Sequence, residues 1–171
     1  MRVVKLAILS FIFLFLLVTG ISLFIPSHVR ISKAVNMRVE PDSIYHEISV
    51  IRNWRNWHPA LKDLPVSDFV FLEDGRMRIK NDYLKILELK KDEVIAELKK
   101  KDGRPITSGM KLIMHLQSDS LTVQWYMDFR LPWYPWEKFK SLFYENIYGL
   151  QMEQGLANLK QLCEARRPSI N

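Results

Sequence analysis

The chain has 171 residues, of which 48% are apolar and 26% are charged, and its formal net charge is +6. This length predicts one domain with a single core and a short additional segment. Arg2 and Lys5 precede a long apolar run, so the rest of the chain is only mildly basic, which favours an anionic lipid surface over nucleic acid as a partner. The single cysteine, Cys163, excludes an intrachain disulfide, and its apolar position predicts a small core residue.

An uncharged apolar run follows a short basic stub at residues 1–5. The run covers residues 6–25, and 20 helical residues rise about 30 Å, the thickness of a bilayer's hydrocarbon core. We therefore expect a transmembrane anchor helix at 6–25, ended by Pro26, and a juxtamembrane linker at 26–28. A cleavable signal peptide is the alternative, but the run is longer than the usual signal core and no A-x-A-like site closes it.

The charges that flank the run give only a weak indication of orientation. Arg2 and Lys5 lie on one side, and Arg30, Lys33 and Arg38 lie on the other. Because a short basic stub before an apolar run resembles a secretory start, we expect a single-pass membrane protein whose soluble domain lies outside the cytoplasm.

The domain begins with a predicted strand at 29–39, rich in β-branched residues. The segment from Glu40 to Ser43 then supplies helix-start chemistry, so a helix is expected from Pro41 to about residue 51. Trp54 and Trp57, three residues apart, are predicted to share one helical face until Pro59 ends that segment. A loop is expected over residues 61–65.

The following sequence alternates between apolar and polar residues and contains hairpin signals at residues 74–75, 91–92, 102–103 and 118–119, which together predict an antiparallel meander. Segments 76–82 and 84–90 can form either one bent strand or two. The expected strands are 68–73, 76–82, 84–90, 93–101, 106–117 and 121–131.

The last strand has one wholly apolar face and one largely polar face. Its apolar positions include Trp125, Met127 and Phe129, whereas Tyr126 and Asp128 are expected on the wet face. The preceding strand continues the apolar face with Met110, Leu112 and Met114.

A long amphipathic helix is predicted over 136–165, followed by a tail at 166–171. Gly149 and Gly155 inside it predict a bend or a close approach, because each costs about 1 kcal/mol relative to alanine. Its apolar stripe comprises Phe139, Leu142, Phe143, Ile147, Leu150, Leu156, Leu159 and Cys163.

This order of elements resembles the START-like superfamily, also called SRPBCC, and most closely its polyketide cyclase/dehydrase-like members. The resemblance depends on the strand at 29–35 leading to Pro41, on Trp54, Trp57 and Pro59, which look like the family's Trp-x-x-Trp-x-Pro element, and on the final helix. It covers nearly the whole segment 29–165. The resemblance implies an α+β helix-grip fold, in which an antiparallel β-sheet wraps around a long C-terminal α-helix, with two short helices after the first strand.

The resemblance also implies a cavity between the sheet and the long helix for a lipid or another apolar molecule. Methionine and aromatic side chains suit such a pocket. His58 and Tyr144 are the possible polar groups in it. The expected lining residues are Trp54, Trp57, Met110, Leu112, Met114, Trp125, Met127, Phe129, Phe143 and Ile147.

The sequence contains no nucleophile elbow, P-loop, dinucleotide fingerprint or zinc-spaced His/Cys cluster. We therefore expect no cofactor and no metal, and we predict a membrane-tethered binding domain for a hydrophobic small molecule, without a nucleic-acid partner. Two alternatives stay open: a cyclase- or hydrolase-type enzyme that uses the same cavity, and a protein-interaction module with a filled core. A cavity of about 300 Å³ or more favours a ligand site over the filled core.

Overall fold

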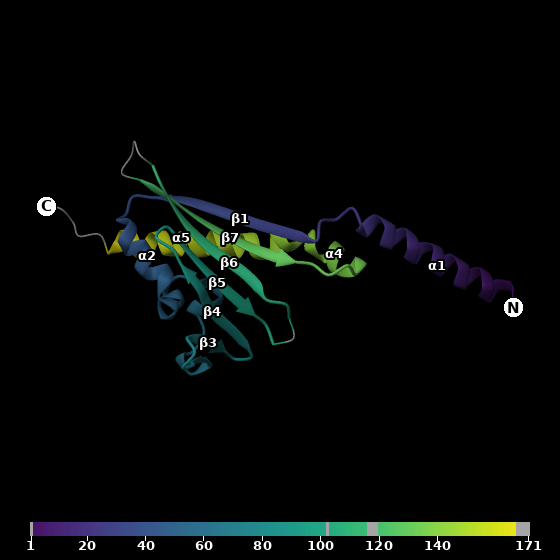
Figure 1. The fold of residues 1–171 in the computed structure, drawn as a ribbon, viewed down its shortest axis with the longest axis horizontal. Helices are drawn as coiled ribbons and strands as arrows, with labels where there is room; N and C mark the ends of the chain where they lie inside the picture. The colour runs from purple at the N-terminus through teal and green to yellow at the C-terminus, as the bar shows by residue number, and fades with distance from the viewer. Residues whose placement is uncertain (1, 102, 116–119, 167–171) are drawn as a thin grey trace.

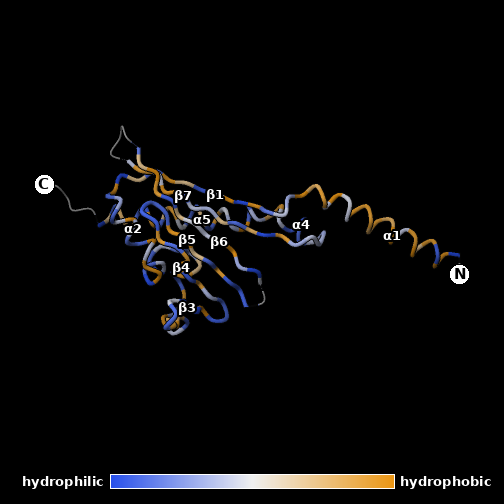
Figure 2. The backbone as a smooth tube through the Cα atoms, in the orientation of Figure 1, coloured by the Kyte–Doolittle hydropathy of each residue, from blue (hydrophilic) through white to orange (hydrophobic). Residues whose placement is uncertain are grey.

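The computed structural model describes residues 2–101, 103–115 and 120–166, and it consists of an α+β domain from which one helix projects (Figure 1). The projecting helix is α1 (Arg2–Ser22), whose 21 residues are long and apolar enough to cross a membrane and are almost wholly exposed. It ends at Ser22, before the end of the apolar run, and three further turn hydrogen bonds extend to Ile25. Figure 2 shows the apolar character along this helix. The turn expected at Ser118 and Asp119, and the tail beyond Arg166, lie outside the described residues.

The domain contains a seven-stranded antiparallel sheet in the order β1-β7-β6-β5-β4-β3-β2, which confirms the predicted meander. β3 and β4 are separate strands joined by Lys80 and Asn81. β1 is the edge strand next to β7, and the two pair along their whole length, from His28 opposite Arg130 to Met37 opposite Leu121. The strands are β1 (His28–Met37), β2 (Phe69–Phe71), β3 (Arg76–Ile79), β4 (Asp82–Leu89), β5 (Glu93–Lys99), β6 (Ile106–Met114) and β7 (Leu121–Arg130).

Short helices connect β1 to β2. They are α2 (Pro41–Ser49), a 3₁₀ helix at Ile51–Asn56, α3 (Pro59–Lys62) and a 3₁₀ turn at Val66–Asp68. Pro59 was expected to end a helix, but it begins α3, where its missing N–H leaves no bond unmade. The loop predicted over residues 61–65 is therefore partly helical.

The C-terminal helix is long, as predicted, but it has an irregular middle. α4 (Pro135–Ser141) is followed by a π-helical turn at Glu145–Gly149 and then by α5 (Leu150–Ala165). The inward residues from α4 to the π turn are Lys138, Ser141, Tyr144 and Tyr148. The predicted apolar stripe is wrong in this half of the helix, because Leu142, Phe143, Ile147 and Leu150 are 48–68% exposed.

α5 crosses the inner face of the sheet (Figure 1) and forms the core with it. The apolar alternation of β7 is confirmed, because Leu121, Val123, Trp125, Met127 and Phe129 are all at most 6% exposed. From α5, Met152, Leu156, Leu159 and Cys163 complete this layer, which also confirms Cys163 as a core residue. The fold is the expected α+β arrangement of a sheet around a long C-terminal helix.

Candidate ligand-binding site

A cavity of about 500 Å³ lies between the inner face of the sheet, α3 and the start of α5. Its floor comes from β6 and β7, its sides from β3, β4 and β5, and its roof from the π turn and α5. The lining is mostly apolar. It comprises Trp54, His58, Ala60, Leu61, Leu64, Ile79, Lys80, Asn81, Asp82, Leu84, Leu98, Lys100, Ser108, Trp125, Met127, Tyr148, Gln151 and Met152.

Three tryptophans surround the ring of His58 at one end of this cavity. The His58 ring stacks on Trp54 at 6.0 Å between centroids, and it lies 5.5 Å from the ring of Trp57 and 5.2 Å from that of Trp125. The 3₁₀ helix produces this cluster, because three residues per turn put Trp54 and Trp57 on the same side of the chain. Both indoles also donate hydrogen bonds to carbonyls of α2, at Ile48 and Glu47.

His58 has a defined protonation state at neutral pH. Its Nδ1 accepts a hydrogen bond from the backbone N–H of Ala60, at 3.2 Å, and so caps the start of α3. Burial among the indoles lowers the pKa of His58 to about 4. A neutral ring that accepts at Nδ1 carries its proton on Nε2, so His58 can offer one donor to a ligand.

Ser108 is the second polar group on the cavity wall. Its Oγ accepts a hydrogen bond of 2.8 Å from Nε1 of Trp125 on the neighbouring strand, and both side chains are buried. This bond satisfies the indole donor and leaves the Ser108 hydroxyl hydrogen free to orient. Ser108 was missed in the sequence, although it precedes Met110 by two residues and so shares its inward face.

The mouth of the cavity is polar. Lys80, Asn81 and Lys100 contribute to its rim and are exposed. Lys80 adopts a positive φ of 54° in the β3–β4 connection, which brings this turn opposite α3. A ligand in the cavity would therefore meet apolar walls inside and two ammonium groups at the rim.

The predicted lining residues divide into four groups. Trp54, Trp125, Met127 and the polar candidate His58 line the cavity. Trp57, Met110 and Leu112 are buried in the core beyond it, where the inner face is packed.

The third group does not face the cavity. Met114 is 56% exposed because it is the last residue of β6. Phe143 and Ile147 are 61% and 48% exposed, so their expected inward orientation is wrong, because at 3.6 residues per turn both positions lie on the side of the helix away from Leu156. Tyr148, Gln151 and Met152 line the wall in their place.

Phe129 and Tyr144 line a separate cleft of about 410 Å³ at the α4 end of the sheet. Their ring centroids are 4.7 Å apart, and burial raises the pKa of Tyr144. The cleft shares Lys100 and Tyr148 with the main cavity, so the two spaces adjoin.

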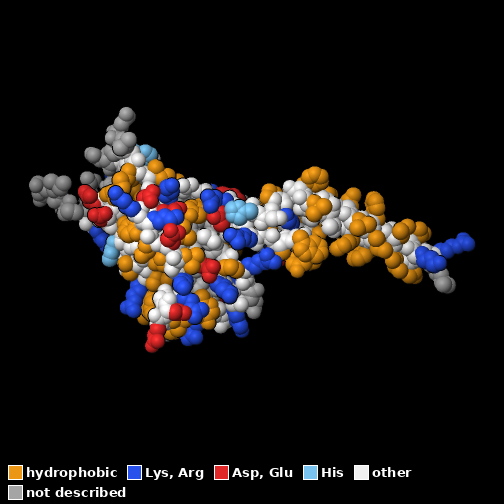
Figure 3. Space-filling view, in the orientation of Figure 1, with side chains coloured by type: hydrophobic (Ala, Val, Ile, Leu, Met, Phe, Trp, Pro, Cys, Tyr) orange, Lys and Arg blue, Asp and Glu red, His pale blue; other side chains and the backbone are white. Residues whose placement is uncertain are grey.

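The outer face of the sheet is polar, as predicted for Tyr126 and Asp128. Arg30 binds both carboxylate oxygens of Asp128 at 2.7 Å, which lowers the pKa of that carboxyl. Tyr126 lies under Arg30 and donates to Glu93, and burial together with this carboxylate raises the pKa of Tyr126 to about 12. A hollow of about 580 Å³ on β3–β5 is lined mainly by charged side chains, and Figure 3 shows both charge signs over the domain surface.

Metal ligands are not gathered at any of these places. Within the described ranges, no three His, Cys, Asp or Glu side chains come close enough to hold a metal ion together. The cavity contains one acid, Asp82, and one imidazole, His58, and neither belongs to a recognisable catalytic set.

Solved structures with this fold are found, although no family model and no curated protein matches the chain. CalU16 from Micromonospora echinospora is 11% identical, with a TM-score of 0.56 over 81% of this chain and 68% of that protein. A START superfamily protein from Mycobacterium smegmatis is 15% identical, with a TM-score of 0.51 over 80% of this chain and 97% of its own. The di-domain ARO/CYC protein StfQ of the steffimycin biosynthetic pathway is 11% identical, with a TM-score of 0.56, and the chain spans about half of it, 51%. The chain therefore has the START-like helix-grip fold that its sequence resembles.

Proposed function

We propose that this chain is a membrane-tethered START-like protein that binds an apolar or amphipathic molecule between the sheet and α5. The observation that carries the proposal is the cavity of about 500 Å³. Its volume falls within the range of about 300–1,000 Å³ that is usual for small-molecule sites. Such a space favours a ligand over the filled core that a pure interaction module would need.

The lining supports a lipid-like ligand. Indole, thioether and aliphatic groups make up most of the wall, and they suit an apolar body of variable shape. Polar groups are the minority of the wall. His58 and Ser108 offer single hydrogen bonds, and Lys80 and Lys100 stand at the rim, where Lys80 also pairs with Asp68 at 3.4 Å. The other polar lining residues are Asn81, Asp82, Tyr148 and Gln151. A molecule with an apolar body and a polar or anionic end fits this distribution.

Tethering by α1 is the second part of the proposal. The apolar window of α1 is 0% buried by the domain, so the helix adds nothing to the domain's core and needs another apolar environment. A bilayer supplies it, with residues 6–25 as the anchor and residues 29–165 as the binding domain. We place the domain outside the cytoplasm, from the basic stub and the secretory character of the start.

Native mass spectrometry of the full-length protein, released from detergent micelles, tests the ligand. We expect a discrete bound mass in the wild type that is lost in Leu64→Trp, since the larger ring would fill the space behind the mouth. Leu89→Trp is the matched control, because Leu89 is 55% exposed and outside the cavity. Lipids that adhere to α1 should stay bound to all three proteins alike. If the discrete bound mass assigned to the cavity is also equal in all three, the proposal is contradicted.

A further inference from the structure

Three aromatic side chains are exposed where the chain passes from β7 into α4, and the last of them, Trp136, belongs to the first turn of α4. Trp133, Tyr134 and Trp136 are 66%, 37% and 61% exposed. They stack mainly on one another: the rings of Trp133 and Tyr134 are 4.9 Å apart, and those of Tyr134 and Trp136 are 5.1 Å apart and nearly parallel. We call residues 132–136 the aromatic loop. Large aromatic rings held out of the core in this way indicate a contact with something outside the domain.

The aromatic loop lies beside the domain-proximal end of α1 (Figure 1), and specific bonds hold the two together. Nζ of Lys138 donates to the carbonyl of Ile25 at 2.5 Å and to Oγ of Ser27 at 2.8 Å. This ammonium group is buried, and it binds the segment that follows α1. In addition, the backbone N–H of Leu131 donates to the carbonyl of Ser27 at 2.7 Å. The loop is thus fixed to the end of the anchor.

The length of α1 places this junction at a membrane boundary. With the turns that follow it, the helix reaches Ile25, and the 20 residues of the proposed anchor rise about 30 Å, so if Leu6 stands at one surface of a bilayer, Ile25 stands near the other. Leu23 and Phe24, just before that boundary, are 74% and 90% exposed. Tryptophan and tyrosine prefer this interfacial level, because each ring has an apolar body and a polar edge.

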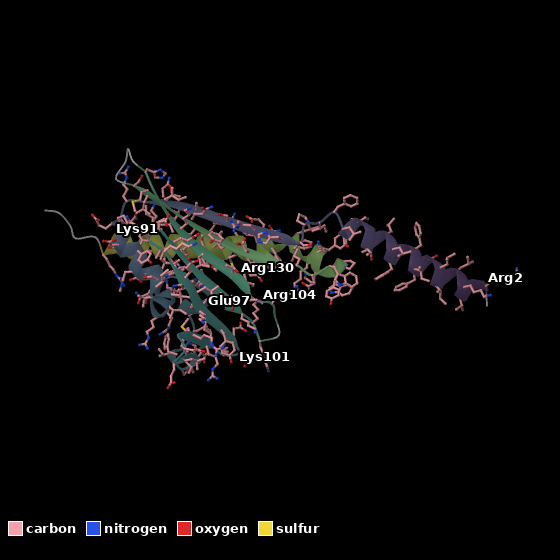
Figure 4. The ribbon with its side chains drawn as sticks, in the orientation of Figure 1. Arg2, Lys91, Glu97, Lys101, Arg104 and Arg130 are labelled. Atoms are coloured by element: carbon pink, nitrogen blue, oxygen red, sulfur yellow. The ribbon has the colours of Figure 1, made fainter. Side chains whose placement is uncertain are left out.

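The charge around the loop matches a lipid surface. The cleft of about 410 Å³ beside it is lined by Lys100, Arg104, Arg130 and Lys140, with Glu137 as the one acid among its lining residues. Figure 4 shows Arg104 and Arg130 toward the α4 end of the domain. None of the ion pairs found among the described residues includes any of these four cations. Anionic headgroups attract such a cluster of cations.

We propose that the aromatic loop inserts into the interfacial layer of the bilayer that α1 crosses, with the cationic cleft turned toward its headgroups. This inference rests on the proposed anchor. Docking in this way would orient the domain, because the loop adds a second fixed contact to the anchor. The cleft adjoins the main cavity through Lys100 and Tyr148, so the docked domain would present that shared wall to the lipid.

Tryptophan quenching by lipid tests the inference. The full-length protein is reconstituted into vesicles of phosphatidylcholine and phosphatidylglycerol whose acyl chains carry bromine close to the headgroup. Only vesicles that float with the protein after alkaline washing are measured, so a failed anchor is detected separately. We expect lipid-dependent quenching in the wild type that falls in W133F/W136F to the residual level that brominated lipid inside the cavity gives Trp54 and Trp125.

A relocated tryptophan provides the matched control. Phe143 is as exposed as Trp136, at 61%, but it lies about 10 Å further along the C-terminal helix, which runs away from α1 (Figure 1). In the W133F/W136F background, F143W should add quenching by aqueous iodide and add none by brominated lipid beyond the level of that background. The inference is overturned if floated wild-type protein shows iodide quenching of Trp133 and Trp136 without quenching by lipid. The inference is also overturned if brominated lipid quenches F143W as strongly as it quenches Trp133 and Trp136. Contact with the lipid would then not be confined to the aromatic loop.

Discussion

Gly155 of α5 lies directly against the indole of Trp125 on β7. A Cβ atom at Gly155 would be 2.6 Å from Cζ3 of Trp125 and 3.1 Å from Cδ of Pro59. The helix can therefore approach the cavity floor this closely only with glycine at this position. The close approach expected for this glycine from the sequence is confirmed.

Gly155→Ala is expected to destabilise the protein by about 1–3 kcal/mol, because overpacking outweighs the gain of about 1 kcal/mol in helix propensity. The measurement is thermal unfolding in detergent, followed by near-ultraviolet circular dichroism. Gly149→Ala is the control, since the atoms that its Cβ would meet are the flexible ends of Glu145 and Lys33. An unchanged melting temperature for Gly155→Ala would refute the packing argument.

Ser108→Ala removes the acceptor of the Trp125 indole and leaves a buried N–H unpaired. We expect a loss of about 1–3 kcal/mol in the free energy of unfolding. Ser32→Ala is the matched change on the outer face, where Ser32 accepts from Gln124 at an exposed position, and its effect should stay within about 0.5 kcal/mol. Equal effects in urea titrations of the two variants would count against the role given to Ser108.

His58 should make folding stability depend on pH. Its pKa is about 4 in the folded protein, against 6.5 for the ordinary side chain, so the unfolded chain binds a proton more readily. Its contribution is fully present above about pH 6.5 and is lost as the pH falls to about 4, by at most about 3 kcal/mol.

The control for this pH dependence is His58→Asn, which can still cap α3 but does not titrate. Stability of the two proteins is compared by urea unfolding between pH 7 and pH 4. We expect a shallower pH dependence in His58→Asn. Identical profiles would exclude His58 as the source.

The carboxylate of Glu47 is 2% exposed and forms an ion pair with Arg166 near the end of the C-terminal helix. Arg166→Gln leaves that buried charge without its cation, so we expect a loss of about 3–5 kcal/mol. Lys160→Gln breaks the exposed pair with Glu164, at 3.9 Å, and should change stability by no more than about 0.5 kcal/mol. Comparable losses in the two variants would show that Glu47 is not effectively buried.

The sheet was predictable because its signal is local. Strict alternation in β7 identified Trp125, Met127 and Phe129 as inward, and the same period could have added Ser108. The C-terminal helix was harder, because the expected stripe combined two faces: at 3.6 residues per turn, Phe143 and Ile147 lie on the side away from Leu156. Gly149, for which a bend or a close approach was expected, ends the π turn at Glu145–Gly149, and Tyr148 and Met152 line the wall in place of Phe143 and Ile147.

The polar interior of α4 could not be predicted either. Lys138 is charged, and sequence patterns place charged residues outside a core, yet this side chain is only 5% exposed. Its partners, the Ile25 carbonyl and Ser27, are more than 100 residues away in the chain and come near only in the folded state. The α1–α4 junction is therefore a tertiary feature.

Photo-crosslinking with a diazirine fatty acid, applied to the full-length protein in vesicles, tests the central claim most directly. If an apolar ligand occupies the cavity, peptide mapping should find the label on Met127, Met152 and their neighbours on the wall, and competition by unlabelled fatty acid should remove it. Met114, which is 56% exposed and outside the cavity, should stay unlabelled. Label confined to α1 and the exposed surface, with none on Met127 or Met152, would contradict the account.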